Sequence, residues 1–238
     1  MLELVVTGQS CKEGKVVLEE MALFFENRLA GYDEHMRTEI EGAAEFYRFT
    51  AGQLPGAGAC EILDLGCGTG LELEEYFALN PLARVTGIDL SEGMLAALRE
   101  KFPERALTLI CGSYFDVPFG EERFHGAVSV ESLHHFTAER KLSLYEKLYR
   151  SLKPGGCFIL TDYFAESESL EQEYFENLRE LKAEQGIEDD AFYHYDTPLT
   201  VDHEIQVLRS AGFSGCEILR RWGATCTVRA VKTTEEMN

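Results

Sequence analysis

Short apolar segments alternate with longer segments of helical periodicity through most of the chain. Five short segments, rich in Ile, Val and Leu, have the pattern of buried strands. They are Glu61–Leu65, Arg84–Asp89, Leu107–Cys111, Gly126–Val130 and Cys157–Asp162. The amphipathic segments between them are Leu71–Leu79, Gly93–Phe102 and Glu139–Leu152. Strands joined by helix-length connections cannot pair as hairpins, so the pattern predicts an α/β fold with a doubly wound parallel sheet covered on both faces.

The C-terminal part departs from this alternation. After a predicted helix over Val201–Ala211, two apolar runs follow, Cys216–Trp222 and Thr225–Val231, with only two residues between them. So short a connection permits only an antiparallel hairpin. We therefore expect a seven-stranded sheet that is mostly parallel and ends in an antiparallel hairpin.

Two further segments predict helical caps on this sheet. Residues 18–54 have apolar positions near helical spacing and precede the first strand. Residues 163–198 form an insertion between the fifth strand and the last helix, and their Glu166–Asp190 stretch is strongly acidic with one apolar helical face. The acidic run fits a solvated helix face. We expect one domain over residues 1–238 with these two caps.

Charge and cysteine content narrow the range of partners. The chain has 42 acidic and 22 basic residues, a formal net charge of −20, which disfavours a basic nucleic-acid-binding face. Its 7 cysteines are scattered without a CxxC pair, so disulfides and zinc are not expected.

No apolar run approaches the roughly 20 residues of a membrane span, and the first residues do not resemble an export signal. We expect a cytoplasmic protein without a membrane partner, and the sequence leaves a homodimer open.

The strongest chemical signal is a glycine-rich turn. The first strand runs directly into Gly66, Gly68 and Gly70, and a helix begins at once. Glycines let the backbone approach a ligand closely, and a helix N-terminus offers free amide donors. Asp89 ends the second strand, where nucleotide-binding α/β folds place the acid that binds ribose hydroxyls. The plainer alternatives are a tight turn and a helix cap.

The stretch Asp64-Leu-Gly-Cys-Gly-Thr-Gly70, together with the terminal hairpin, resembles the class I S-adenosylmethionine-dependent methyltransferases. The resemblance implies a Rossmann-like fold, with S-adenosyl-L-methionine as cofactor. Family members often carry an Asp after the third strand, whereas this chain has Gly112-Ser113-Tyr114. The cofactor-binding residues that the resemblance implies are Asp64, Gly66, Cys67, Gly68, Gly70, Asp89, Leu90, Met94, Ser113, Tyr114, Val130, Glu131 and Tyr32.

Three histidines are candidate catalytic residues. His134 and His135 follow the fourth strand, at the sheet edge where ligands bind, and His194 lies in the run Tyr193-His-Tyr-Asp196. A general base is needed only where the methyl acceptor must lose a proton. Adjacent helical residues point about 100° apart, so at most one of the pair should face the site. Local capping or core hydrogen bonding is the alternative role, and no spacing selects a metal site.

The sequence thus predicts methyl transfer to a small molecule in an enclosed, partly aromatic pocket. Three alternatives stay open: a tRNA or protein methyltransferase, a noncatalytic S-adenosylmethionine-binding regulatory protein, and a nicotinamide oxidoreductase. The glycine spacing and the hairpin disagree with the last of these.

Overall fold

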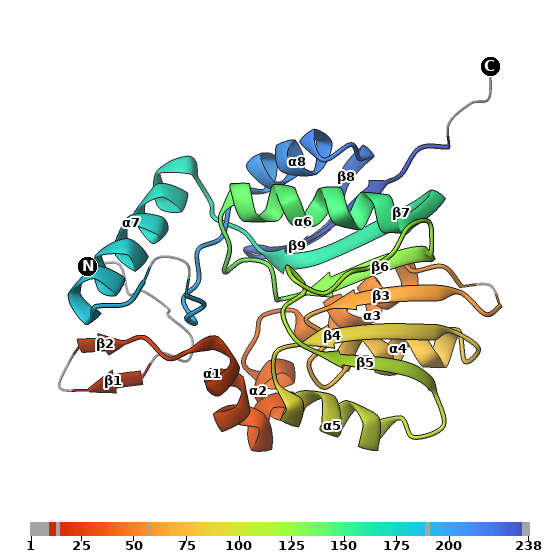
Figure 1. Cartoon of the computed structure of the whole chain (residues 1–238), viewed down its shortest axis with the longest axis horizontal. Coiled ribbons are helices and arrows are strands. Elements are labelled where there is room, and N and C mark those ends of the chain that lie inside the picture. The colour runs from red at the N-terminus through yellow and green to blue at the C-terminus, as the bar shows by residue number, and fades with distance from the viewer. Residues whose placement is uncertain (1–9, 13–14, 57, 189–190, 235–238) are drawn as a thin grey trace.

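One seven-stranded sheet organises the chain in a computed structural model that describes residues 10–12, 15–56, 58–188 and 191–234 (Figure 1). Its strand order is β5-β4-β3-β6-β7-β9-β8. The strands are β3 (Glu61–Leu65), β4 (Arg84–Asp89), β5 (Ala106–Cys111), β6 (Phe124–Val130), β7 (Leu152–Tyr163), β8 (Ser214–Trp222) and β9 (Thr225–Val231). β3 to β7 are parallel, and β9 is antiparallel to both β7 and β8. The predicted sheet is confirmed, including its terminal hairpin.

The topology creates a crevice beside β3. From β3 the chain moves outward to β4 and β5, then returns to place β6 on the other side of β3. Leu65 pairs with Ile88 in β4, and Asp64 pairs with Val128 in β6, so these strands end together at one edge. Ligands of open α/β sheets bind at such a switch point, outside the carboxyl ends of the strands.

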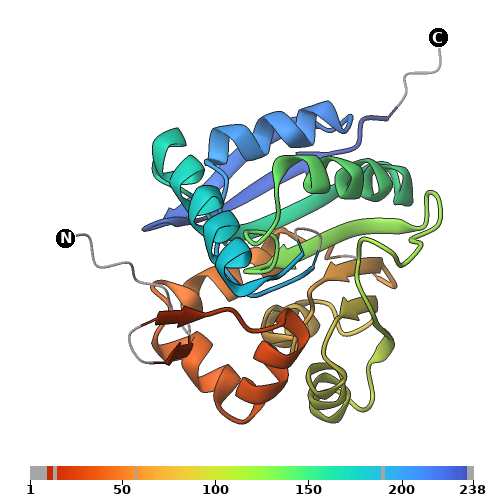
Figure 2. The ribbon, with the colours of Figure 1, turned by 60° about the vertical axis from the view of Figure 1, so that its left-hand side comes forward.

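Helices cover both faces of the sheet, as Figures 1 and 2 show. One face carries α3 (Ala43–Gln53), α4 (Leu71–Leu79) and α5 (Glu92–Lys101), and the other carries α6 (Ala138–Ser151) and α8 (Val201–Ser210). Side chains alternate along β3 between the two faces. Ile62 packs in the core beneath α3, α4 and α5, whereas Leu63 packs in the core beneath α6 and α8. A buried ion pair, Lys141 Nζ to Glu204 Oε2 at 2.5 Å, joins α6 to α8.

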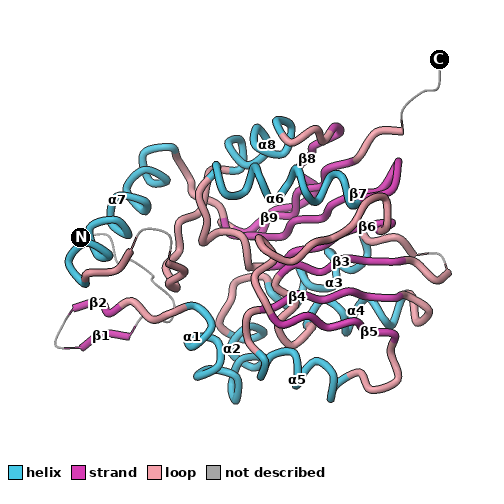
Figure 3. The backbone as a smooth tube through the Cα atoms, in the orientation of Figure 1, coloured by secondary structure: helices cyan, strands magenta, loops and turns pink. Residues whose placement is uncertain are grey.

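The two caps lie together beyond the carboxyl ends of the strands, at the left of Figure 3. They comprise the hairpin β1 (Ser10–Lys12) and β2 (Lys15–Val17), α1 (Met21–Arg28), the 3₁₀ turn η1 (Leu29–Gly31), α2 (Tyr32–Thr38) and α7 (Glu168–Gln185). Backbone bonds fasten the N-terminal cap to the segment after α7: Met21 N–H donates to Phe192 O at 3.1 Å, and His194 N–H to Glu19 O at 2.9 Å.

Local details differ from the expected boundaries. The fifth strand, expected over Cys157–Asp162, begins earlier, because β7 already starts at Leu152 and its register with β6 shifts between Phe124 and Gly126. The helix α3 packs on α4 and β7, so it forms part of the sheet's cover while α1 and α2 form the cap. The acidic segment forms α7 as predicted, although Asp189 and Asp190 lie outside the described residues.

No helix within the described part of the chain is both long and apolar enough to cross a membrane.

Candidate active site

The glycine turn has the backbone geometry that its sequence requires. Gly66, Gly68 and Gly70 have φ values of 75°, 46° and 74°, a left-handed region that other residues rarely adopt. A Cβ on Gly66 would lie 2.6 Å from Ser132 Cβ, so that position has no room for a side chain. Gly70 is the N-cap of α4, and the turn therefore delivers a helix N-terminus to the switch point.

Asp89 is built into the same turn. Its Oδ2 accepts from Gly68 N–H at 2.8 Å, and its Oδ1 accepts from Ser91 N–H at 2.9 Å. Burial raises the pKa of this carboxyl above its ordinary value, although the backbone donors oppose the shift. Each carboxylate oxygen keeps a second lone pair, so Asp89 can accept hydrogen bonds from ribose hydroxyls without releasing the turn.

Two buried carboxyl groups lie behind the turn. Both side-chain oxygens of Asp64, and Oε1 of Glu72 on α4, are buried without a hydrogen-bond partner among the described residues. Burial raises the pKa of both groups, and the nearby Glu72 raises that of Asp64 further. Unpartnered buried acids favour a cationic ligand nearby. The turn therefore suits a ligand with hydroxyl groups near Asp89 and a positive charge near Asp64.

A cavity of about 50 Å³ lies where the turn, Asp89 and the N-terminal cap meet. Its lining residues are Met21, Phe25, Tyr32, Gly66, Gly68, Asp89, Leu90, Met94, Tyr114, Val130, Glu131, Ser132 and His135. Most of the residues implied by the sequence resemblance thus converge on one space. Sequence reasoning missed Met21, Phe25 and Ser132, because only the folded cap brings the first two over the turn.

Four of the implied residues lie outside the cavity lining. Asp64 is beneath the turn, Gly70 begins α4, and Cys67 is buried against β4, where a Cβ on Gly87 would lie 2.7 Å from its Sγ. Ser113 Oγ accepts from Phe115 N–H at 3.2 Å. In this arrangement the Ser113 hydroxyl serves its own turn, and its contact with the adenine stays a prediction.

Glu131 occupies a strained position at the end of β6. Its φ of 48° is unusual for a residue other than glycine, and such strain clusters at functional sites. Its N–H donates to Thr161 O at 2.9 Å, and its Oε1 accepts from Thr225 Oγ1 at 3.1 Å. Burial, with Asp162 as the next cause, raises the pKa of Glu131 to about 8. Glu131 lines the cavity, and its role in binding the cofactor stays a prediction.

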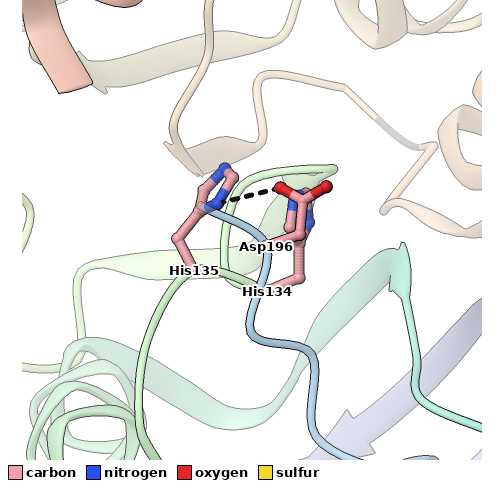
Figure 4. A group of neighbouring side chains, drawn as sticks. All are labelled: His134, His135 and Asp196. Atoms are coloured by element: carbon pink, nitrogen blue, oxygen red, sulfur yellow. Dashed lines mark ion pairs between the residues drawn. The ribbon is translucent and has the colours of Figure 1, made fainter. Parts of the chain in front are cut away.

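The two adjacent histidines have different roles. His135 lines the cavity, whereas His134 lies behind it with Nδ1 2.5 Å from Asp162 Oδ1. Asp196, from the segment before α8, places Oδ1 3.4 Å from His134 Nε2 and 3.4 Å from His135 Nδ1 (Figure 4). Burial and the neighbouring His134 lower the pKa of His135 well below its usual value. Of the pair, His135 alone lines the cavity, and both residues lie in a turn and not in a helix.

His194 belongs to the segment after α7 and contacts the N-terminal cap. Its ring stacks on Phe24 of α1, with centroids 3.5 Å apart, and lies 4.9 Å from the ring of His135. Burial lowers its pKa to about 4, so the ring is neutral near pH 7. Its Nδ1 is buried without a hydrogen-bond partner in the described structure. His194 is absent from the cavity lining, so a catalytic role for it stays a prediction.

Comparisons with known proteins agree with this geometry. A family model described as a methyltransferase domain matches residues 62–156. Over 232 residues the chain is 32% identical to carboxy-S-adenosyl-L-methionine synthase from Wolinella succinogenes, covering 90% of this chain and 92% of that protein. Human N-acetylserotonin methyltransferase, solved in complex with SAM, shares the fold with a TM-score of 0.63 at 20% identity, over 91% of this chain and 60% of that one.

Shorter alignments connect the chain to parts of larger proteins. It is 32% identical over 146 residues to the biotin biosynthesis bifunctional protein BioHC of Teredinibacter turnerae, covering 58% of this chain. It is 34% identical over 108 residues to tRNA (carboxymethyluridine(34)-5-O)-methyltransferase of Arabidopsis thaliana, covering 45% of this chain. The chain spans a quarter of the length of each of these two relatives.

The chain belongs to the class I S-adenosylmethionine-dependent methyltransferases. It is an enzyme whose cofactor is S-adenosylmethionine.

Proposed function

We propose that the enzyme transfers a methyl group to a small-molecule acceptor in a pocket that the two caps enclose when ligands are bound. One observation carries the proposal. Met21, Phe25 and Tyr32 of the N-terminal cap line the same cavity as the glycine turn and Asp89, so the cap roofs the reaction site. A macromolecular acceptor needs an open approach to the methyl group, and a roofed cavity favours a ligand that the cap can cover.

Residues of the second cap, 163–198, also pack near the proposed pocket. Phe192 stacks near Phe115, with ring centroids 5.8 Å apart, and His194 stacks on Phe24. His194 thus packs the second cap on α1, and Phe192 packs it on the segment after β5. Aromatic and apolar walls with a few polar groups are typical of sites for small ligands.

The cap must move to admit ligands. A cavity of about 50 Å³ holds only a few water molecules, whereas ligand sites span about 300–1,000 Å³. Tyr32 lies close above Gly68, within 3.9 Å of where a Cβ would stand there. We infer that α1 and α2 swing outward for binding and close again over the bound ligands.

The chain's own residues then act by binding, positioning and exclusion of water. When bound, S-adenosylmethionine supplies a methyl group on a positively charged sulfur. The glycine turn and Asp89 hold its nucleoside part, while Leu90 and Met94 offer apolar contacts. His135 and Ser132 line the cavity next to Glu131 and can hydrogen-bond an acceptor. Correct alignment of the two reactants supplies several kcal/mol of the barrier reduction.

A labelled-methyl assay tests this proposal. The protein is incubated with methyl-labelled cofactor and a cell extract separated into metabolite, RNA and protein fractions. We expect label in the metabolite fraction, and Asp89→Asn should weaken cofactor binding about 10-fold or more because it removes a charged acceptor. Asp116→Asn, at an exposed position outside the cavity, is the matched control and should behave as the wild type.

Other outcomes would contradict the proposal. Label confined to RNA would favour the activity named for the Arabidopsis relative, and label confined to protein would favour a protein methyltransferase. Binding of the cofactor without transfer to any fraction would favour a noncatalytic regulatory role. The cytoplasmic setting and the homodimer stay predictions.

A further inference from the structure

We propose that His134, His135 and Asp196 bind a divalent transition-metal ion in the wall of the cavity, next to the methyl-transfer site. The three residues come from two distant segments, the turn after β6 and the segment before α8, and Figure 4 shows the Asp196 carboxylate turned toward both imidazoles. One donor atom from each lies within 4.8 Å of the others. Imidazole nitrogens and a carboxylate are the donors that Zn²⁺ and its neighbours in the first transition series prefer.

The spacing of the donors, which form ion pairs in the absence of a metal, is also compatible with a shared metal ion. Asp196 Oδ1 is 3.4 Å from His134 Nε2 and 3.4 Å from His135 Nδ1. Charge-assisted hydrogen bonds between such groups are shorter, about 2.7–2.9 Å. In a tetrahedral site with bonds of about 2.0–2.1 Å, neighbouring ligand atoms are about 3.3–3.4 Å apart. The carboxylate is thus as far from each nitrogen as two ligands of one ion would be.

Asp162 holds His134 in the orientation that a ligand requires. Its Oδ1 lies 2.5 Å from His134 Nδ1, so the Nδ1 proton is engaged and Nε2 is left to face Asp196. Asp162 is itself fixed, because its Oδ2 accepts from Leu133 N–H and its Oδ1 from Tyr163 N–H, each at 2.9 Å. A carboxylate bonded to the far nitrogen of a metal-binding histidine is a recurrent feature of metal sites.

His135 connects the proposed site to the cavity. Its Nδ1 donates to Tyr195 O at 3.2 Å when it carries the ring proton, so metal binding at Nδ1 requires this hydrogen bond to break and the proton to move to Nε2. His135 lines the cavity, and three protein ligands leave a tetrahedral ion with one open position. A metal there lies beside the space where the acceptor would bind.

This placement names an acceptor class, a step that rests on the proposed function. A hydroxyl oxygen of the acceptor binds at the open position, and the metal lowers the pKa of that hydroxyl so that its proton is released to water. The oxygen then forms a bond to the methyl carbon, while the carbon–sulfur bond breaks with its electron pair left on sulfur. The proposed site therefore suits an acceptor that must lose a proton before methylation, such as a hydroxyl.

Metal binding is measured directly, without an activity assay. The Cys111→Ser variant serves as the background, because Cys111 is an exposed thiol that binds metals on its own. The full chain is stripped with a chelator and titrated with Zn²⁺ by calorimetry, and with Co²⁺ by absorption. We expect one ion per chain and a Co²⁺ spectrum of tetrahedral nitrogen and oxygen ligation without thiolate charge-transfer bands.

Variants locate the ion. Asp162→Asn should lower Zn²⁺ affinity about 10–100-fold, as loss of an outer hydrogen-bond partner does, and Asp196→Asn should lower it at least as much. His134→Gln should do the same, and folding of each variant is checked by circular dichroism. His203→Gln is the matched control, because that histidine pairs with Glu171 at 2.6 Å, away from the cluster, and its affinity should equal the background.

Two results would overturn the metal site. One is the absence of stoichiometric binding in the background, which would leave the cluster as an ion-pair network around His134. The other is binding that Asp196→Asn and Asp162→Asn both leave unchanged. Either result can occur while labelled methyl groups still reach small molecules, so failure of the metal site is distinguishable from failure of the proposed function.

Discussion

Asp89 and Asp64, the two aspartates at the glycine turn, differ in their hydrogen-bond partners and therefore in the kind of group each can bind. Asp89 is surrounded by backbone donors, since Gly68 N–H and Ser91 N–H both bind its carboxylate. Asp64 is buried beside Glu72 with no hydrogen-bond partner for either oxygen in the described structure. Asp89 is thus prepared for neutral hydroxyls, whereas the unpartnered Asp64 favours a positive charge.

The pH dependence of stability tests the state of Asp64. Burial raises its pKa above the ordinary value of 3.8, so the unfolded chain loses this proton before the folded chain does. The group therefore imposes no cost below about pH 4 and destabilises the fold increasingly as pH rises through the raised pKa. Asp64→Asn removes that cost. Without cofactor, we expect the variant to gain stability relative to the wild type between pH 4.5 and pH 7.5, measured by urea unfolding.

The comparison of the two pH values is its own control, because any packing effect of the amide is the same at both. An equal stability difference at pH 4.5 and pH 7.5 would show that Asp64 does not carry a raised pKa in the fold.

At the residue scale, the sequence predicted the parts of the site that depend on local pattern. Gly66, Gly68 and Asp89 follow buried strands, and their positions in the cavity wall follow from the parallel register. The positive φ of Glu131 was not predictable, because non-glycine strain leaves no mark in composition. The pairing of His134 with Asp162 joins residues 28 apart in sequence, and only the fold reveals it.

At the scale of elements, polar contacts join α1 and α2 of the N-terminal cap to α5, next to the glycine turn. Glu26 Oε2 accepts from Ser91 Oγ at 2.6 Å and from Gly93 N–H at 3.2 Å, which ties α1 to the start of α5. On α2, Asp33 Oδ2 lies 2.7 Å from Lys101 Nζ. These contacts hold α1 and α2 against α5, and the proposed opening of the cap would break them.

Weakening the contacts between α1 and α5 should speed the release of S-adenosylhomocysteine, the product that the cofactor leaves after methyl transfer. Glu26→Gln replaces charge-assisted hydrogen bonds with neutral ones, which costs about 1 kcal/mol and predicts roughly 5-fold faster dissociation of S-adenosylhomocysteine. Stopped-flow fluorescence measures that rate. Glu34→Gln, an exposed change on α2, should leave the rate unaltered. A wild-type rate in Glu26→Gln would mean that α1 does not limit exit.

The sequence predicted the elements better than their mutual positions. Periodicity located the strands, the flanking helices and α7, because each depends on a continuous apolar face. The joining of the caps depends on contacts such as Leu18 N–H to Gln185 Oε1 at 3.1 Å, between residues 167 apart. No local pattern encodes such a contact, and for this reason Met21 and Phe25 were not anticipated in the cavity.

At the scale of the whole molecule, charge and topology agree on the type of ligand. The net charge of −20 disfavours polyanionic partners, and two of the acidic residues, Asp64 and Asp89, lie at the glycine turn. The strand order fixes the site at the switch between β3 and β6, and the caps close it. The fold thus provides a general cofactor site, while the identity of the acceptor depends on the caps and on the residues after β6.

A crystal structure with S-adenosylhomocysteine bound tests the central claim most directly. The account predicts that the sulfur of the ligand faces a closed space bounded by Glu131, Ser132 and His135, with Tyr32 and Phe25 covering it. A sulfur that opens onto a broad solvent-exposed groove, with α1 and α2 packed away from it, would contradict an enclosed small-molecule site.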